Sequence, residues 1–113
     1  MHELAVTKNI IEMILSESRK NNITPRLINA ELGMLTTYKK DPILFYFDAM
    51  KKEHSLLSDS TLIIKEIKGK IRCKDCNKES NVTEQYLLFC PECNSFNITI
   101  IEGKDFKIRN IED

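Results

Sequence analysis

The sequence has no excess of charge of either sign and no long apolar run. Lysine plus arginine equals aspartate plus glutamate, at 17 each, so net charge does not draw the whole chain to nucleic acid or to an anionic membrane. No apolar stretch approaches the ~20 residues of a membrane span. Charged side chains spread through the first twenty residues exclude the core of a signal peptide. We therefore expect a cytoplasmic protein with no membrane partner.

Internal repeats and low-complexity linkers are also missing from the sequence. The length of 113 residues suits one domain, or one domain carrying a small module. With only two histidines, no Ser/His/Asp or Cys/His arrangement for nucleophilic catalysis is visible. These absences favour a binding protein over an enzyme.

The four cysteines form two matched pairs, Cys73-x-x-Cys76 and Cys90-x-x-Cys93, separated by thirteen residues. In a cytoplasmic protein such pairs are thiolate ligands rather than disulfides. Each short loop presents two sulfurs to one ion, and a hairpin between the pairs completes a tetrahedral four-sulfur site. The spacing predicts structural zinc, and a rubredoxin-like iron site is the alternative.

Hydrophobic periodicity predicts helices and strands around this cysteine segment. Apolar residues recur at helical spacing over residues 3–20 and alternate as in a strand over residues 26–36. Asp41 is expected to cap a second helix, whose wide apolar face includes Phe45. Residues 61–69 are rich in β-branched side chains and are expected to form another strand.

The predicted order gives an α+β fold: a small three-stranded β-sheet with two helices on one face, plus an inserted zinc-ribbon module. We place the α+β domain at residues 1–69 and 97–113 and the module at residues 70–96. Gly33 indicates a bulge or a close backbone approach within the first strand. Gly103 is expected to break the closing segment into two strands or to interrupt one long strand.

The first three residues, Met1-His2-Glu3, offer a second set of metal donors. A bulky second residue favours retention of Met1, because the processing enzyme prefers small residues there. The free α-amine, the backbone nitrogen and imidazole of His2, and the backbone nitrogen of Glu3 then supply four nitrogens, which favour Ni(II) or Cu(II) in a planar geometry. The same residues also suit an ordinary helix start, since an acid is favourable in the first turn.

Taken together, these features resemble the HypA/HybF family of hydrogenase and urease nickel-incorporation proteins. The resemblance covers the whole chain and rests on Met1-His2-Glu3, the order of elements and the paired cysteines. Smaller matches are Leu32-Gly33, Leu44-Phe45, Cys90-Pro91, Ser95 and Gly103-x-x-x-x-Ile108. One departure is Asn94, where the family often has glycine; asparagine tolerates the left-handed conformation best after glycine.

The resemblance implies a nickel metallochaperone rather than an enzyme. It implies Ni(II) at Met1, His2 and Glu3, with Asp41 as a weaker candidate nearby, and Zn(II) at Cys73, Cys76, Cys90 and Cys93. It also implies a nickel-handling GTPase as partner and the large subunit of a NiFe hydrogenase as recipient, with urease maturation proteins in some organisms. We expect a monomer or weak homodimer that does not bind nucleic acid.

An alternative is a zinc-ribbon adaptor for nucleic acid or a protein complex, in which the first three residues play no part. Basic residues at the entry to the module support it: Lys68, Lys70, Arg72, Lys74 and Lys78. A solvated charged face explains these residues equally well. A rubredoxin-like electron carrier is the third reading of the same cysteines.

Overall fold

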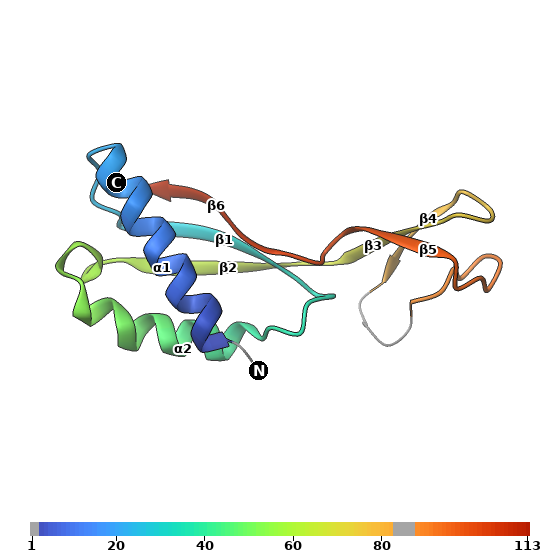
Figure 1. Ribbon diagram of the computed structural model, residues 1–113, viewed down its shortest axis with the longest axis horizontal. Helices are drawn as coiled ribbons and strands as arrows, with labels where there is room; N and C mark the ends of the chain where they lie inside the picture. Colours follow the sequence, from blue (N-terminus) through green and yellow to red (C-terminus); the bar gives the residue numbers. More distant parts are fainter. Residues whose placement is uncertain (1–2, 83–87) are drawn as a thin grey trace. The chain divides into compact units, whose positions relative to one another are not determined.

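A computed structural model describes residues 3–82 and 88–113 (Figure 1). The chain forms two compact units. The first contains residues 1–30, 38–65 and 107–113, and the second contains residues 31–37 and 66–106. Within the described residues, no helix has the length and apolar character needed to cross a membrane.

The first helix, α1, runs from Glu3 to Lys20, as its hydrophobic spacing predicted. Its buried apolar residues form one face, while Leu4 and Met13 are exposed. The helix ends because Asn22 takes a positive φ of 54°. The N–H of Ile23 then donates to the carbonyl of Ser18 at 3.0 Å, which is the reverse-turn cap of a Schellman motif.

The second helix, α2, spans Lys40–Met50 and packs against α1. Lys39, not Asp41, occupies the N-cap position, and Asp41 lies in the first turn. The buried apolar face of α2 is narrower than the face predicted from the sequence: Phe47 is fully buried, but Phe45 is 69% exposed. Two short 3-10 helices follow, η1 at Lys51–Glu53 and η2 at Ser55–Leu57.

Three strands form the sheet that the helices cover: β1 (Leu27–Gly33), β2 (Thr61–Ile67) and β6 (Phe106–Glu112), in the order β2-β1-β6. Backbone bonds join residue 26 to 61 and residue 34 to 67, so β1 and β2 run parallel, with α2 on the connection between them (Figure 1). Bonds from 26 to 112 and from 33 to 105 make β6 antiparallel to β1. Only one face is apolar and buried, as predicted for helices on one side.

The cysteine segment has a sheet of its own, with the order β4-β3-β5. These strands are β3 (Gly69–Cys73), β4 (Glu79–Val82) and β5 (Ile98–Glu102), and both pairings are antiparallel. The single strand expected over residues 61–69 is therefore wrong at its end: β2 stops at Ile67, and β3 begins at Gly69 and leads through Cys73 into the first cysteine loop.

All three glycines of the chain meet within the second unit. A Cβ atom added to Gly33 would lie 2.1 Å from the carbonyl oxygen of Gly103, and one added to Gly69 would lie 2.4 Å from the Leu35 side chain. Gly103 takes a positive φ of 88° between β5 and β6, which breaks the closing segment into two strands. Of the two alternatives predicted at Gly33, a bulge or a close backbone approach, the structure shows the close approach.

Candidate metal centre

The sulfur atoms of Cys73, Cys76, Cys90 and Cys93 all lie within 4.8 Å of one another. The Cys73 and Cys93 sulfurs are 3.5 Å apart, and those of Cys76 and Cys90 are 3.6 Å apart. Zinc–sulfur bonds of about 2.3 Å in a tetrahedron place the sulfurs roughly 3.8 Å from one another. The cluster thus has the donor type and the spacing that one tetrahedral ion requires, and all four cysteines are free of disulfides.

Each cysteine pair sits on a loop closed by its own backbone hydrogen bonds. In the first loop, the N–H of Cys73 donates to the carbonyl of Lys78, and the N–H of Asn77 donates to the carbonyl of Cys73, both at 2.9 Å. An equivalent pair of bonds recurs around Cys90, at 2.8 Å each. The two loops therefore have the same backbone design, which explains how residues three apart direct their sulfurs to one point.

Asparagine follows the second cysteine in both loops. Asn77 and Asn94 each have a φ of 62°, in the left-handed region where asparagine is the best tolerated residue after glycine. The left-handed conformation expected at Asn94 is confirmed. The left-handed conformation of Asn77 was not predicted. The pattern Cys-x-x-Cys-Asn, which occurs at both cysteine pairs, is the sequence signal that would have indicated it.

Replacing Asn94 by glycine is expected to leave the thermal midpoint of the metal-loaded protein unchanged or slightly raised. Replacing it by alanine is expected to destabilise the protein by about 1 kcal/mol, because a Cβ atom disfavours positive φ and alanine lacks the polar side chain that eases it. Differential scanning calorimetry measures both variants. Asn81→Ala on β4, an extended and exposed position, is the control; equal losses in both alanine variants would contradict the backbone explanation.

The first loop also lowers the pKa of one thiol. The backbone N–H of Cys76 donates to the sulfur of Cys73 at 3.4 Å. This bond is the main cause that lowers the pKa of the Cys73 thiol to about 7. Since thiolate is the form that binds metal, the lowered pKa increases the fraction of Cys73 in the ligand form near neutral pH.

Two of the predicted nickel ligands, Met1 and His2, lie outside the described residues. Glu3 begins α1 and is 9% exposed. Its carboxylate Oε2 accepts a hydrogen bond of 3.1 Å from the backbone N–H of Lys39, the N-cap of α2. An acid from the start of α1 therefore stabilises the positive end of α2, the role that the sequence pattern assigned to Asp41.

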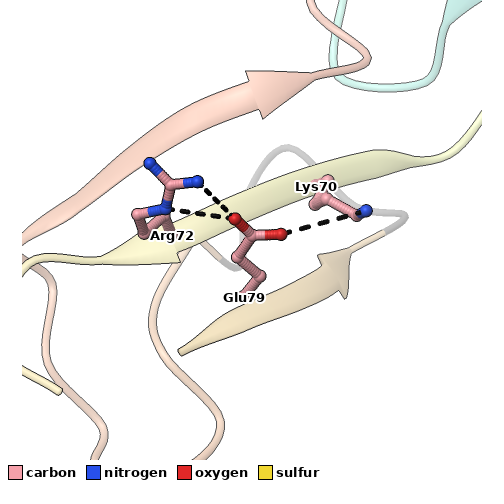
Figure 2. A network of polar contacts seen from close by, with 3 residues as sticks. All are labelled: Lys70, Arg72 and Glu79. Carbon is pink, nitrogen blue, oxygen red and sulfur yellow. Dashed lines mark hydrogen bonds and ion pairs between the residues drawn. The ribbon is translucent and has the colours of Figure 1, made fainter. Parts of the chain in front are cut away.

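The basic residues at the entry to the cysteine segment are mostly paired with acids. Arg72 and Lys70 both contact Glu79 across β3 and β4 (Figure 2), with 3.1 Å from Arg72 Nε to Glu79 Oε2 and 4.0 Å from Lys70 Nζ to Glu79 Oε1. The hydrogen bond from Arg72 lowers the pKa of the Glu79 carboxyl, so the pair is charged at neutral pH. Lys78 lies 3.8 Å from Glu92. This pairing reduces the positive surface that a nucleic-acid ligand would need.

Comparisons with known proteins agree over the full length of the chain. The family described as "Hydrogenase/urease nickel incorporation, metallochaperone, hypA" matches residues 1–113. The chain belongs to the HypA family. Among curated relatives, the hydrogenase maturation factor HypA of Moorella thermoacetica is 36% identical over 109 residues, which cover 96% of this chain and 95% of the relative. HypA of Crocosphaera subtropica is 32% identical over 112 residues, covering 99% and 95%.

The fold agrees as well. The solution structure of the nickel metallochaperone HypA from Helicobacter pylori superposes with a TM-score of 0.71, covering 99% of this chain and 97% of that one at 23% identity. Membership in the HypA family makes this chain a nickel metallochaperone of hydrogenase or urease maturation. Its four-cysteine cluster is suited to zinc.

Proposed function

We propose that this HypA-family chain binds Ni(II) at its N terminus and delivers it to the large subunit of a NiFe hydrogenase, without catalysing a reaction. The observation that carries the proposal is the match of residues 1–113 to the nickel-incorporation family. A nickel-handling GTPase is the proposed partner in the transfer, and urease maturation proteins are further partners where that enzyme is present. We propose that the protein acts in the cytoplasm.

The nickel ligands that we propose are nitrogens of Met1, His2 and Glu3. The α-amine of Met1, the backbone nitrogen and imidazole of His2, and the backbone nitrogen of Glu3 form fused chelate rings that suit a planar d8 ion. The carboxylate of Glu3 is engaged with the N–H of Lys39. That contact supports a role for the Glu3 side chain in holding the start of α1. The backbone nitrogen of Glu3 is the proposed nickel ligand.

Zn(II) on the four cysteines is the proposed structural ion. Four thiolates fill its coordination shell, so this ion has no open position for a substrate. Residues 70–96 form the proposed zinc-ribbon module, and residues 1–69 with 97–113 form the proposed nickel-binding domain. In this proposal zinc holds the two loops together, and nickel is the metal that the protein delivers.

A calorimetric Ni(II) titration of zinc-loaded, untagged protein tests the N-terminal site. We expect one nickel per chain and a loss of affinity of about a hundredfold or more, about 3 kcal/mol, in His2→Ala. A variant with one extra residue ahead of Met1 should lose as much, because the α-amine is displaced from the chelate. Affinity should also fall between neutral and mildly acidic pH, since protonated imidazole cannot bind metal.

His54→Ala is the matched control, because His54 is the other histidine of the chain and lies between η1 and η2. Its nickel titration should match that of the unchanged protein. If His2→Ala and the extended variant both bind nickel as tightly as the unchanged chain, the first three residues are only a helix start. A loss confined to His54→Ala would move the nickel site away from the terminus.

A further inference from the structure

Two sets of side-chain contacts join the first cysteine loop, residues 73–78, to the second cysteine loop, residues 90–95. Each loop keeps its shape through its own backbone bonds, and one further backbone bond, from the N–H of Lys74 to the carbonyl of Asn97 at 2.9 Å, ties the first loop to the segment that follows the second. A metal held by two thiolates from each loop leaves when the loops separate. Contacts that cross from one loop to the other therefore oppose the loss of the metal.

The first set is a closed network centred on Asp75. The Ser95 hydroxyl donates to Asp75 Oδ2, and the Asn97 side-chain amide donates to Asp75 Oδ1 at 3.4 Å. The backbone N–H of Asn97 donates in turn to the Ser95 hydroxyl oxygen at 3.0 Å. Both carboxylate oxygens are used, and the hydroxyl donates once and accepts once. Bonds to a charged acceptor are stronger than bonds between neutral groups.

The second set is the contact between Lys78 and Glu92. Asp75 and Glu92 occupy the same position of their loops, directly before the second cysteine. Glu92 is 57% exposed on its side chain, and among the described residues its carboxylate pairs with the Lys78 ammonium, at 3.8 Å. Exposed ion pairs of this kind contribute little. The chain thus contains two acids at equivalent positions next to the cysteines, of which one is built into an inter-loop network.

We propose that Asp75, Ser95 and Asn97 form an inter-loop clasp that slows exchange of the metal on the four cysteines. These are positioning residues: they touch no metal and act by holding the second loop against the first. The clasp lets the structural ion stay in place while another metal passes through the same small protein. The proposal rests on the zinc site that we assign to the four cysteines.

The rate of zinc transfer to an excess of chelator tests the clasp on the full chain. We expect about fivefold faster loss from Asp75→Ala and from Ser95→Ala, the size expected for one net hydrogen bond at this exposed site. The double variant should be little faster than either single variant, because each single variant already breaks the Ser95–Asp75 bond at the centre of the network. Ser95→Thr should restore the original rate, since threonine carries the same hydroxyl.

Glu92→Ala is the matched control, because it removes the same charge from the equivalent position without touching the clasp. It should lose zinc within about twofold of the original rate. Co(II)-loaded variants should all keep the absorption of a tetrahedral four-thiolate site, which shows that the site is built and only its exchange has changed. An altered Co(II) spectrum in Asp75→Ala or Ser95→Ala would overturn the proposal.

Two outcomes separate this proposal from the zinc site itself. Unchanged protein that holds no zinc would remove the proposed zinc site. Unchanged protein that holds zinc, together with original exchange rates in both Asp75→Ala and Ser95→Ala, would remove the clasp alone. Equal acceleration in Glu92→Ala and Asp75→Ala would also overturn the clasp, because the cause would then be the loss of negative charge near the thiolates.

Discussion

Removal of zinc is expected to unfold the cysteine segment while α1 and α2 stay folded. The reason is the small apolar core of this segment. In the described part of residues 70–96, the buried apolar side chains are Ile71, Cys73 and Cys90, and two of these three are proposed ligands. Structural zinc supplies about 10–16 kcal/mol of apparent binding free energy in zinc-finger peptides, far more than burial of one isoleucine at about 2–3 kcal/mol.

Two-dimensional amide NMR of the zinc-loaded and chelator-treated protein measures this effect residue by residue. Signals of β3, β4 and β5 should collapse to the narrow range of an unfolded chain, and those of α1 should keep their dispersion. Cys90→Ser should behave like the chelated protein even with zinc present, because a hydroxyl does not replace a thiolate ligand. Added zinc should restore the unchanged chain but not this variant. Preserved dispersion in β3 at negligible zinc content would contradict the proposed structural role.

Gly33→Ala is expected to be strongly destabilising, more so than Gly69→Ala. The new Cβ atom would lie 2.1 Å from the Gly103 carbonyl oxygen and 2.7 Å from the Gly103 Cα. These neighbours are backbone atoms, so no side chain can move aside. The carbonyl also accepts a hydrogen bond of 2.8 Å from the N–H of Leu35, which a shift would break. We expect a loss of at least about 3 kcal/mol in the free energy of unfolding.

Urea unfolding of the zinc-loaded protein, followed by circular dichroism, measures this loss. Thr99→Ala on β5 is the control, because it is an exposed strand position where alanine brings only its lower strand propensity. Gly69→Ala is the informative comparison: its nearest neighbour is the flexible Leu35 side chain, so its cost should be smaller and partly relieved by Leu35→Ala. A Gly33→Ala variant as stable as Thr99→Ala would show that the backbones can separate at no cost.

The elements with strong local signals were predictable. The 3.6-residue spacing of apolar side chains defined α1 from Glu3 to Lys20. The cysteine spacing predicted a four-sulfur cluster, because two residues between cysteines fit only a tight loop that presents both sulfurs on one side. Gly33 indicated either a bulge or a close backbone approach, since a strand interior otherwise disfavours glycine, and the close approach is the one found.

Contacts between distant parts of the chain were not predictable in the same way. Asp41 is a residue type that favours the N-cap position. The carboxylate that accepts a hydrogen bond at the start of α2 nevertheless belongs to Glu3, 36 residues before the donor Lys39. Phe45 fits an apolar helical face, yet it is exposed because α2 turns Ile43 and Phe47 inward. The break between β2 and β3 follows from the pairing of β3 with β4 and β5, which no single window of sequence contains.

The sequence by itself predicted the four-cysteine cluster and the family, because these depend on residue types at short, fixed spacings. Only the tertiary structure decided which partner each glycine meets, which acid caps α2 and which of two equivalent acids, Asp75 or Glu92, joins the cysteine loops. The physical reason is that hydrogen bonds and steric contacts depend on distances of a few ångströms between residues remote in the chain. Local sequence patterns specify the helices, strands and loops, and tertiary packing decides which of their residues are in contact.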